Sequence, residues 1–209
     1  MSTQWLRAGA LGSFAAAVLL ALQFGIAAGL GSDLILLETS LDAARVTAFL
    51  QTHAATVINL MIADNLFVVA YTLSFVGLTL YAVTRQRLFA VTALVFALLT
   101  SASDITENAL TISMARAAMG GVALETNWLM VLQILAQWKW MWIYVGVTLF
   151  AVTLWDNSRG ARVVAILFLI FPLIGVMAPA SITLGLLRIV WMFVLLIAGG
   201  IFLWRVSKT

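Results

Sequence analysis

Long apolar stretches separated by short polar segments dominate the pattern of the chain. A membrane-spanning helix needs about 20 mostly apolar residues, and the stretches of that kind are residues 8–31, 56–84, 88–114, 127–155, 161–178 and 181–204. The first stretch is longer than the ~7–15 apolar residues of a signal peptide, so we assign it as a helix. The pattern predicts an all-α, polytopic integral membrane protein in which residues 1–209 form one transmembrane domain, a bundle of six helices.

The polar segment at about residues 32–54 separates the first two stretches. Its sequence Thr39-Ser40-Leu41-Asp42 resembles a capping box with Asp in place of the usual Glu. Behind the polar positions, Leu41, Phe49 and Leu50 can form an apolar stripe. We expect a short amphipathic outer helix that lies on the membrane surface.

Composition supports the membrane class and excludes several others. Hydrophobic residues make up 64% of the chain and charged residues 9%, against ~45–50% and ~25% in a soluble domain. With no Cys and one His, a disulfide framework, an iron–sulfur cluster and a Cys-bound or His-rich metal site are excluded. The net charge of +3 is not clustered as a nucleic-acid binder requires. We expect no metal, no cofactor and no nucleic-acid partner.

The charges between the apolar stretches predict the orientation. One set of loops and both termini carry basic residues, namely Arg7, Arg85, Arg87, Arg159, Arg162, Arg205 and Lys208. The opposite loops carry Asp33, Glu38, Asp42 and Glu125 with only Arg45 and Arg116. The positive-inside rule then places both termini in the cytoplasm, and an even number of spans agrees. The predicted location is a cell (inner) membrane.

Five charged residues fall within the predicted spans, where charge is costly and normally faces a protein interior or a water-filled cavity. They are Asp64, Asp104, Glu107, Lys139 and Arg188. At ~1.5 Å per residue, all lie ~24–30 Å from the predicted cytoplasmic ends, and Gln23 lies at a similar depth. The shared depth predicts one polar layer in the outer half of the bilayer.

One face of the third predicted helix gathers polar side chains. Thr100, Asp104, Glu107, Asn108 and Thr111 follow a four-then-three spacing, so they share a face that cannot look at lipid. We expect Asp104 or Glu107 within ion-pair distance of Lys139 or Arg188. The predicted substrate-binding residues are Asp64, Asn65, Asp104, Glu107, Asn108, Gln137, Lys139 and Arg188.

Two further patterns have a packing and a functional interpretation. Small residues recur at every fourth position of the first helix, at Gly9, Ser13, Ala17, Ala21, Gly25 and Gly29. They permit close approach of a neighbouring helix of the same chain, or of a second copy in a homodimer. Lys139 lies among Trp138, Trp140 and Trp142, of which Trp142 has helical-neighbour spacing for a cation–π contact. Otherwise these tryptophans pack in the core or face lipid.

The run Asp104-Ile105-Thr106-Glu107-Asn108-Ala109-Leu110, followed on the next helix by Lys139 in a Trp-rich setting, resembles a D-x-x-E-N pattern of uncharacterised bacterial multi-pass membrane proteins. The resemblance covers the third and fourth predicted helices. It implies a multi-pass membrane protein and carries no activity with it.

Three functions are compatible with the polar layer. The first is binding or transport of a polar or amphipathic small molecule or lipid in an outward-facing pocket, with proton coupling as an option, by a single copy, a homo-oligomer or a complex with a partner membrane subunit. The second is an intramembrane enzyme that acts on a lipid or isoprenoid, with Asp104 or Glu107 as the catalytic general acid. The third is an accessory subunit of a larger membrane complex, in which the polar layer is purely structural.

Overall fold

The computed structural model describes residues 3–155 and 158–208, and these ranges are helical with no strand. The long helices are α1 (Thr3–Ala27), α3 (Ala43–Ala82), α4 (Arg87–Met119), α5 (Thr126–Leu154), α6 (Arg159–Met177) and α7 (Ile182–Val206). Short elements connect them: η1 (Ala28–Ile35), α2 (Leu36–Thr39) and η2 (Ala178–Ala180). Five segments of the described chain are helical, long and apolar enough to cross a membrane. The fold is therefore that of a multi-pass, all-helical membrane protein.

Helix α5 is the long helix that falls short of this apolar threshold. Its middle carries Gln133, Gln137 and Lys139, and its several tryptophans are less apolar than aliphatic residues. Polar side chains at the centre of a helix that packs in a bundle normally face the protein interior. Its composition therefore marks α5 as a helix that contributes to an internal site.

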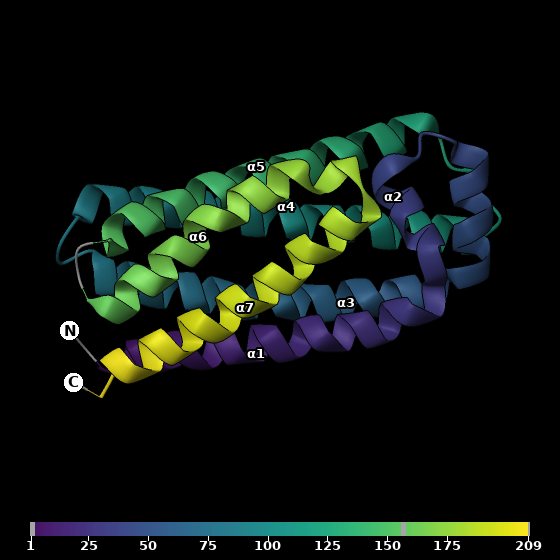
Figure 1. The fold of residues 1–209 in the computed structure, drawn as a ribbon. Coiled ribbons are helices and arrows are strands. Elements are labelled where there is room, and N and C mark those ends of the chain that lie inside the picture. The colour runs from purple at the N-terminus through teal and green to yellow at the C-terminus, as the bar shows by residue number, and fades with distance from the viewer. Residues whose placement is uncertain (1–2, 156–157, 209) are drawn as a thin grey trace.

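The long helices form a closed ring. Each packs against its neighbours in the order α1, α3, α4, α5, α6 and α7, and α7 returns to α1. The start of α1 and the end of α7 lie at the same end of the bundle (Figure 1). We call this the basic end, because the residues at or beside its helix ends include Arg7, Arg85, Arg87, Arg159, Arg162, Arg205 and Lys208.

The opposite end of the bundle is covered by η1, α2 and the first turns of α3, residues 28–57, which we call the cap (Figure 1). Buried apolar side chains of the cap contact α4 and α5. They include Leu30, Leu37, Val46, Phe49 and Leu50, against Met114, Ala118, Leu129 and Leu132. At ~1.5 Å per residue, the 40 residues of α3 extend about 60 Å, twice the ~30 Å of a bilayer core. The helix therefore has length to spare for the cap.

The predicted outer helix at residues 32–54 differs from the observed structure. Residues 43–54 continue without a break into α3, and Asp42 is the N-cap, with its side chain accepting a hydrogen bond from the backbone N–H of Arg45 at 3.1 Å. The expected box beginning at Thr39 does not start this helix. Phe49 and Leu50 are buried against other helices, because the ends of α4 and α5 offer them an apolar surface within the protein.

Close packing near the basic end depends on small and aromatic residues. A Cβ added to Gly9 of α1 would lie 2.8 Å from Cα of Gly77 in α3, so the two backbones touch where neither helix has a side chain. Phe75 and Phe150 stack with ring centroids 5.6 Å apart, and Phe150 is fully buried. The small-residue stripe of α1 thus packs within the chain at Gly9. At Gly25 and Gly29 an added Cβ would meet nothing within 4 Å.

Candidate functional site

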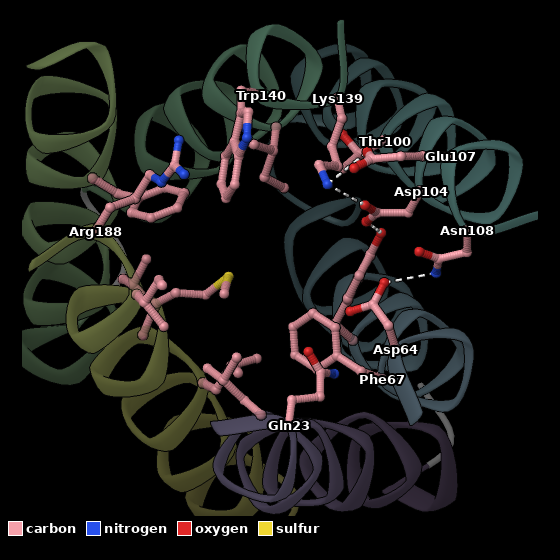
Figure 2. A pocket seen from close by; sticks show the side chains of 18 of the residues that line it. Gln23, Asp64, Phe67, Thr100, Asp104, Glu107, Asn108, Lys139, Trp140 and Arg188 are labelled. Carbon is pink, nitrogen blue, oxygen red and sulfur yellow. Dashed lines mark hydrogen bonds and ion pairs between the residues drawn. The ribbon is translucent and has the colours of Figure 1, made fainter. Parts of the chain in front are cut away.

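A cavity of about 310 Å³ lies inside the ring, between the cap and the aromatic core near the basic end. Leu34 and Leu37 of the cap line one end of it, and Phe75, Phe168 and Phe171 line the other. Figure 2 shows side chains from helices all around the ring pointing toward this space. The cavity is at the lower limit of the ~300–1,000 Å³ that small-molecule sites occupy.

The polar face of α4 forms one wall of the cavity. Thr100, Asp104, Glu107, Asn108 and Thr111 all line it, and all are buried, with Glu107 the most exposed at 8%. The prediction that this face avoids lipid is confirmed. The four-then-three spacing works because these positions lie above one another on successive turns of a helix.

Lys139 of α5 joins the two acids of α4. Its Nζ lies 3.1 Å from Oδ1 of Asp104 and 2.7 Å from Oε2 of Glu107. This contact confirms the prediction, made from matched depth, that Lys139 pairs with at least one of these carboxylates. Two carboxylates one turn apart repel each other, and an ammonium group between them removes most of that repulsion.

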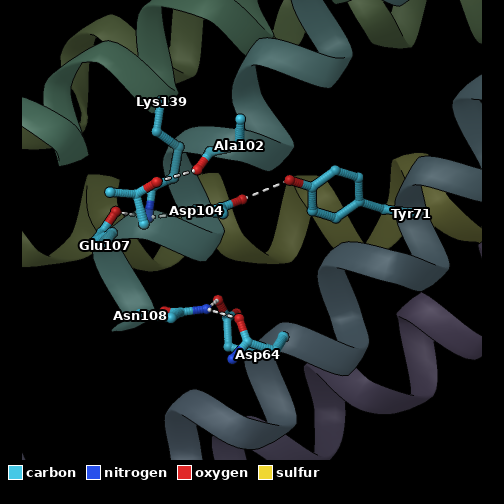
Figure 3. A network of polar contacts seen from close by, with 9 residues as sticks. Asp64, Tyr71, Ala102, Asp104, Glu107, Asn108 and Lys139 are labelled. Carbon is cyan, nitrogen blue, oxygen red and sulfur yellow. Dashed lines mark hydrogen bonds and ion pairs between the residues drawn. The ribbon is translucent and has the colours of Figure 1, made fainter. Parts of the chain in front are cut away.

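Tyr71 of α3 is a site residue that the candidates from the sequence do not include. Its hydroxyl donates a hydrogen bond to Oδ2 of Asp104 at 2.6 Å (Figure 3). Asp104 therefore contacts Lys139 through one oxygen and Tyr71 through the other. Its spacing could have identified Tyr71 from the sequence, because Tyr71 lies seven residues after Asp64 and thus two turns along the same helix face.

A second link between α3 and α4 passes through Asn108. Its side-chain amide donates to Oδ2 of Asp64 at 2.7 Å and to Oδ1 of Asn65 at 3.0 Å (Figure 3). The two N–H bonds of one amide are thereby used by two residues of α3. Asp64 lines the cavity, and Gln23 of α1 lies beside it on the cavity wall (Figure 2).

Arg188 does not join this cluster. It comes from α7, on the side of the cavity away from Asp104 and Asp64 (Figure 2). Its Cζ lies 3.6 Å from the ring centroid of Trp140, which is a close cation–π contact. Trp142, the expected aromatic partner of Lys139, packs instead against Phe96 with ring centroids 5.6 Å apart. Lys139 Nζ is 5.5 Å from the Trp140 ring, so Trp140 is the tryptophan that faces the charges.

Two of the predicted binding residues lie off the cavity wall. Gln137 is exposed on the outside of the bundle and does not line the cavity. It precedes Lys139 by two residues, which turns it by about 200° around the helix, so the two side chains face opposite ways. Asn65 also does not line the cavity, and its contact with Asn108 is structural.

The acids and their lysine partner lie on one side of the cavity wall. The acids and Lys139 come from α3, α4 and α5, whereas α1, α6 and α7 contribute mainly apolar side chains. The apolar part includes Leu20, Phe24, Phe168, Phe171, Ile189 and Met192. The cavity can therefore accept a molecule that has a polar group and an apolar portion.

Comparison with known proteins adds no relative: no family model matches the chain, and neither a curated protein nor a solved structure shows significant similarity to it.

Proposed function

We propose that this protein binds an amphipathic small molecule or lipid within the membrane and takes part in its transport. The polar group of the ligand contacts the charged side chains that line the cavity, and its apolar portion lies against the apolar side chains of α1, α6 and α7. The observation that carries the proposal is that the charged cluster lines an open space of about 310 Å³ instead of filling the gap between helices. A purely structural ion pair needs no such space.

The number of charged groups also supports a site. One ion pair is enough to orient two helices, and charges inside a membrane are rare and costly. Here two carboxylates surround Lys139, a third is bound by Asn108, and Tyr71 adds a hydroxyl. Contacts of this kind bind a polar ligand group with direction, because charge-assisted hydrogen bonds are short and strong.

The proposal includes the topology. We take α5 as the sixth span, because its 29 residues exceed the ~20 that a span requires and its neighbours in the ring, α4 and α6, are both apolar enough to span. An even number of passes agrees with the two chain ends at the basic end (Figure 1). By the positive-inside rule the basic end faces the cytoplasm, and the membrane is the inner one.

A substitution that fills the cavity tests the proposal. Met192 of α7 lines the cavity and is half-buried, whereas Val190 on the same helix is 57% exposed and does not line it. Each is changed to Trp. After purification in a mild detergent, native mass spectrometry detects any bound molecule from the host membrane, and chromatography with mass spectrometry identifies it.

We expect wild type and Val190→Trp to carry the bound molecule and Met192→Trp to lose it at similar melting temperature. Retention by Met192→Trp contradicts the proposal. So does a wild type that carries nothing under conditions that keep annular lipids attached.

A further inference from the structure

The contact between α1 and α7 is close near the basic end and becomes looser toward the cap. Ser13 donates to the carbonyl oxygen of Leu196 at 2.8 Å, and a Cβ added to Gly200 would lie 2.7 Å from the ring of Phe14. Toward the cap this contact is looser, because Ile189 and Met192 pack against the cluster that includes Ala16 and Leu20 only as partly buried side chains. In α1 no residue after Leu20 is buried, and in α7 none of the described side chains before Leu195 is buried.

The loose half of this contact lies directly over the cavity. Phe24 lines the cavity and is also 42% exposed. Gly25 of α1 and Gly185 of α7 would carry a Cβ with nothing within 4 Å of it. In Figure 1, α7 crosses the bundle at an angle to α1, and the two helices diverge toward the cap. Phe24 is thus a cavity-lining residue that also reaches the outside of the bundle, in the loosely packed half of the α1–α7 contact, and we call this place the side opening.

Arg188 lies on α7 at this opening and has no carboxylate partner among the described residues. Its Cζ lies 3.6 Å from the centroid of the Trp140 ring, its charged group lies beside the Tyr144 hydroxyl, and its Nε is buried without a hydrogen-bond acceptor. A guanidinium group carries five N–H donors, and intramembrane charges are normally paired. Lys139, by contrast, contacts two carboxylates.

Stacking on Trp140 uses the flat face of the guanidinium and leaves its in-plane N–H groups available. That edge matches the two oxygens of a carboxylate or phosphate group, which arginine binds in a bidentate manner. The wall around it is apolar, with Ile189 and Met192 on the same helix and Phe171 on α6. An anionic group joined to a hydrocarbon chain fits both features.

We propose that the cavity holds a single-chain anionic amphiphile, which enters from the bilayer between α1 and α7 and places its carboxylate or phosphate on Arg188. This proposal rests on the proposed function and names the class of its ligand. A cavity of about 310 Å³ suits one chain better than two, because it is at the lower limit of the ~300–1,000 Å³ range. The amphiphile supplies the anion that Arg188 lacks within the protein.

Binding of defined amphiphiles to the delipidated full-length protein tests the charge preference. The probes are oleate, oleoyl lysophosphatidylglycerol, the neutral monoolein and inorganic phosphate, each titrated in a non-ionic detergent with native mass spectrometry as the readout. Arg188→Gln is compared with Arg162→Gln, which removes an exposed charge at the basic end. The two anionic probes distinguish a carboxylate from a phosphate headgroup, and inorganic phosphate tests whether the chain is required.

We expect wild type and Arg162→Gln to bind the anionic amphiphiles more tightly than monoolein. Arg188→Gln should weaken anionic binding by roughly tenfold to a hundredfold, the equivalent of losing a hydrogen bond to a charged group, and leave monoolein unchanged. Inorganic phosphate should not displace oleate. If Arg188→Gln does not fold, the preference of wild type for oleate over monoolein still decides the question.

Each negative result in these binding experiments overturns a different part of the proposal. Equal binding of oleate and monoolein by wild type, or full oleate affinity in Arg188→Gln, overturns the anionic class and leaves the proposed function standing. Displacement of oleate by equimolar inorganic phosphate overturns the requirement for a chain. If wild type binds none of the amphiphiles, this inference is overturned, and the copurification test with Met192→Trp decides the proposed function separately.

The exchange rate of bound oleate tests whether the ligand enters between α1 and α7. Phe24→Trp enlarges the ring at the α1 position that both lines the cavity and is 42% exposed, whereas Val18→Trp places a ring on the same helix at a position that is 69% exposed and away from the cavity lining. We expect Phe24→Trp to slow the exchange of bound oleate for isotope-labelled oleate and Val18→Trp to leave it unchanged. Equal exchange rates in both variants overturn access between α1 and α7.

Discussion

The half of the bundle at the basic end and the half that holds the cavity are built from the same helices by opposite kinds of contact. Near the basic end, Gly9 and Gly77 bring backbones together and Phe150 fills the centre. Toward the cap, polar groups from α3, α4 and α5 join those helices around an open space. In a membrane no hydrophobic force drives helices together, so small residues and polar bonds must hold them. The comparison shows that this chain uses small residues for close packing and polar bonds to frame a cavity.

Removing the cation of the polar half should have the largest effect on stability. Lys139→Met leaves Asp104 and Glu107 close together without their ammonium partner. Breaking a buried pair costs roughly 3–5 kcal/mol, so we expect a clear fall in the melting temperature in detergent. Lys208→Met at the basic end is the control and should melt close to wild type. Equal melting of both variants would mean that the ion pairs contribute nothing to the fold.

The two halves can be compared with one chemical change. Tyr71→Phe removes a buried hydroxyl that donates to Asp104, and Tyr81→Phe removes a hydroxyl that accepts from Arg85 near the basic end. A hydrogen bond to a charged group is worth about 1.5–3 kcal/mol, and solvent replaces the partner more readily at the basic end. We expect Tyr71→Phe to lower stability more than Tyr81→Phe in chemical or thermal unfolding. The reverse order would remove the distinction between the halves.

Two glycines of α1 test the close helix packing near the basic end, because one is tightly packed and the other is in open space. In Gly9→Ala the new methyl group would lie 2.8 Å from the backbone of Gly77, whereas in Gly25→Ala it would meet nothing within 4 Å. Overpacking costs about 1–3 kcal/mol, while Ala in an open helical position gains up to about 1 kcal/mol over Gly. We expect the two substitutions to shift the melting temperature in opposite directions. A loss of stability in Gly25→Ala would indicate a helix or second copy against this face.

The smallest effect is expected at Gln137. Its side chain is exposed outside the bundle, one helix face away from Lys139. Gln137→Leu should change the free energy of unfolding by less than about 0.5 kcal/mol, as for most surface positions, and leave any copurifying molecule in place. Loss of that molecule, seen by native mass spectrometry, would show that the site extends to the outer face of α5.

Residue spacing and depth along the helices predict much of this site. The direction in which each side chain points around its helix decides the rest. The positions of Asp104, Glu107 and Asn108 on one face follow from helical geometry, and counting residues from the helix ends places Lys139 at their level. Depth alone says nothing about the direction of a side chain, which is why Gln137 faces outward and why Arg188 lines the cavity without joining the acids. The pairing of Arg188 with Trp140 depends on how α7 crosses α5 and α6, and local sequence does not encode that.

The cap shows the same limit. The polar segment before α3 indicates an extramembrane element, and Phe49 and Leu50 indicate that it has an apolar side. That side packs on α4 and α5 instead of the membrane surface, because Met114 and Leu129 are exposed to it once the bundle has formed. A pattern within one segment shows that a face is apolar, whereas the partner of that face depends on the tertiary fold.

The most direct test of the central claim is a double variant that restores stability without restoring charge. Lys139→Met with Glu107→Leu replaces the 2.7 Å ion pair by apolar side chains and leaves Asp104 its hydrogen bond from Tyr71. Apolar replacement of both partners of a buried pair is often neutral, so we expect melting closer to wild type than in Lys139→Met alone. If the cluster binds a ligand, this stable protein will carry no copurifying molecule in native mass spectrometry, because an apolar pair cannot replace charge-assisted contacts. Full retention of the molecule by the restored variant would contradict the account and make the cluster a purely structural one.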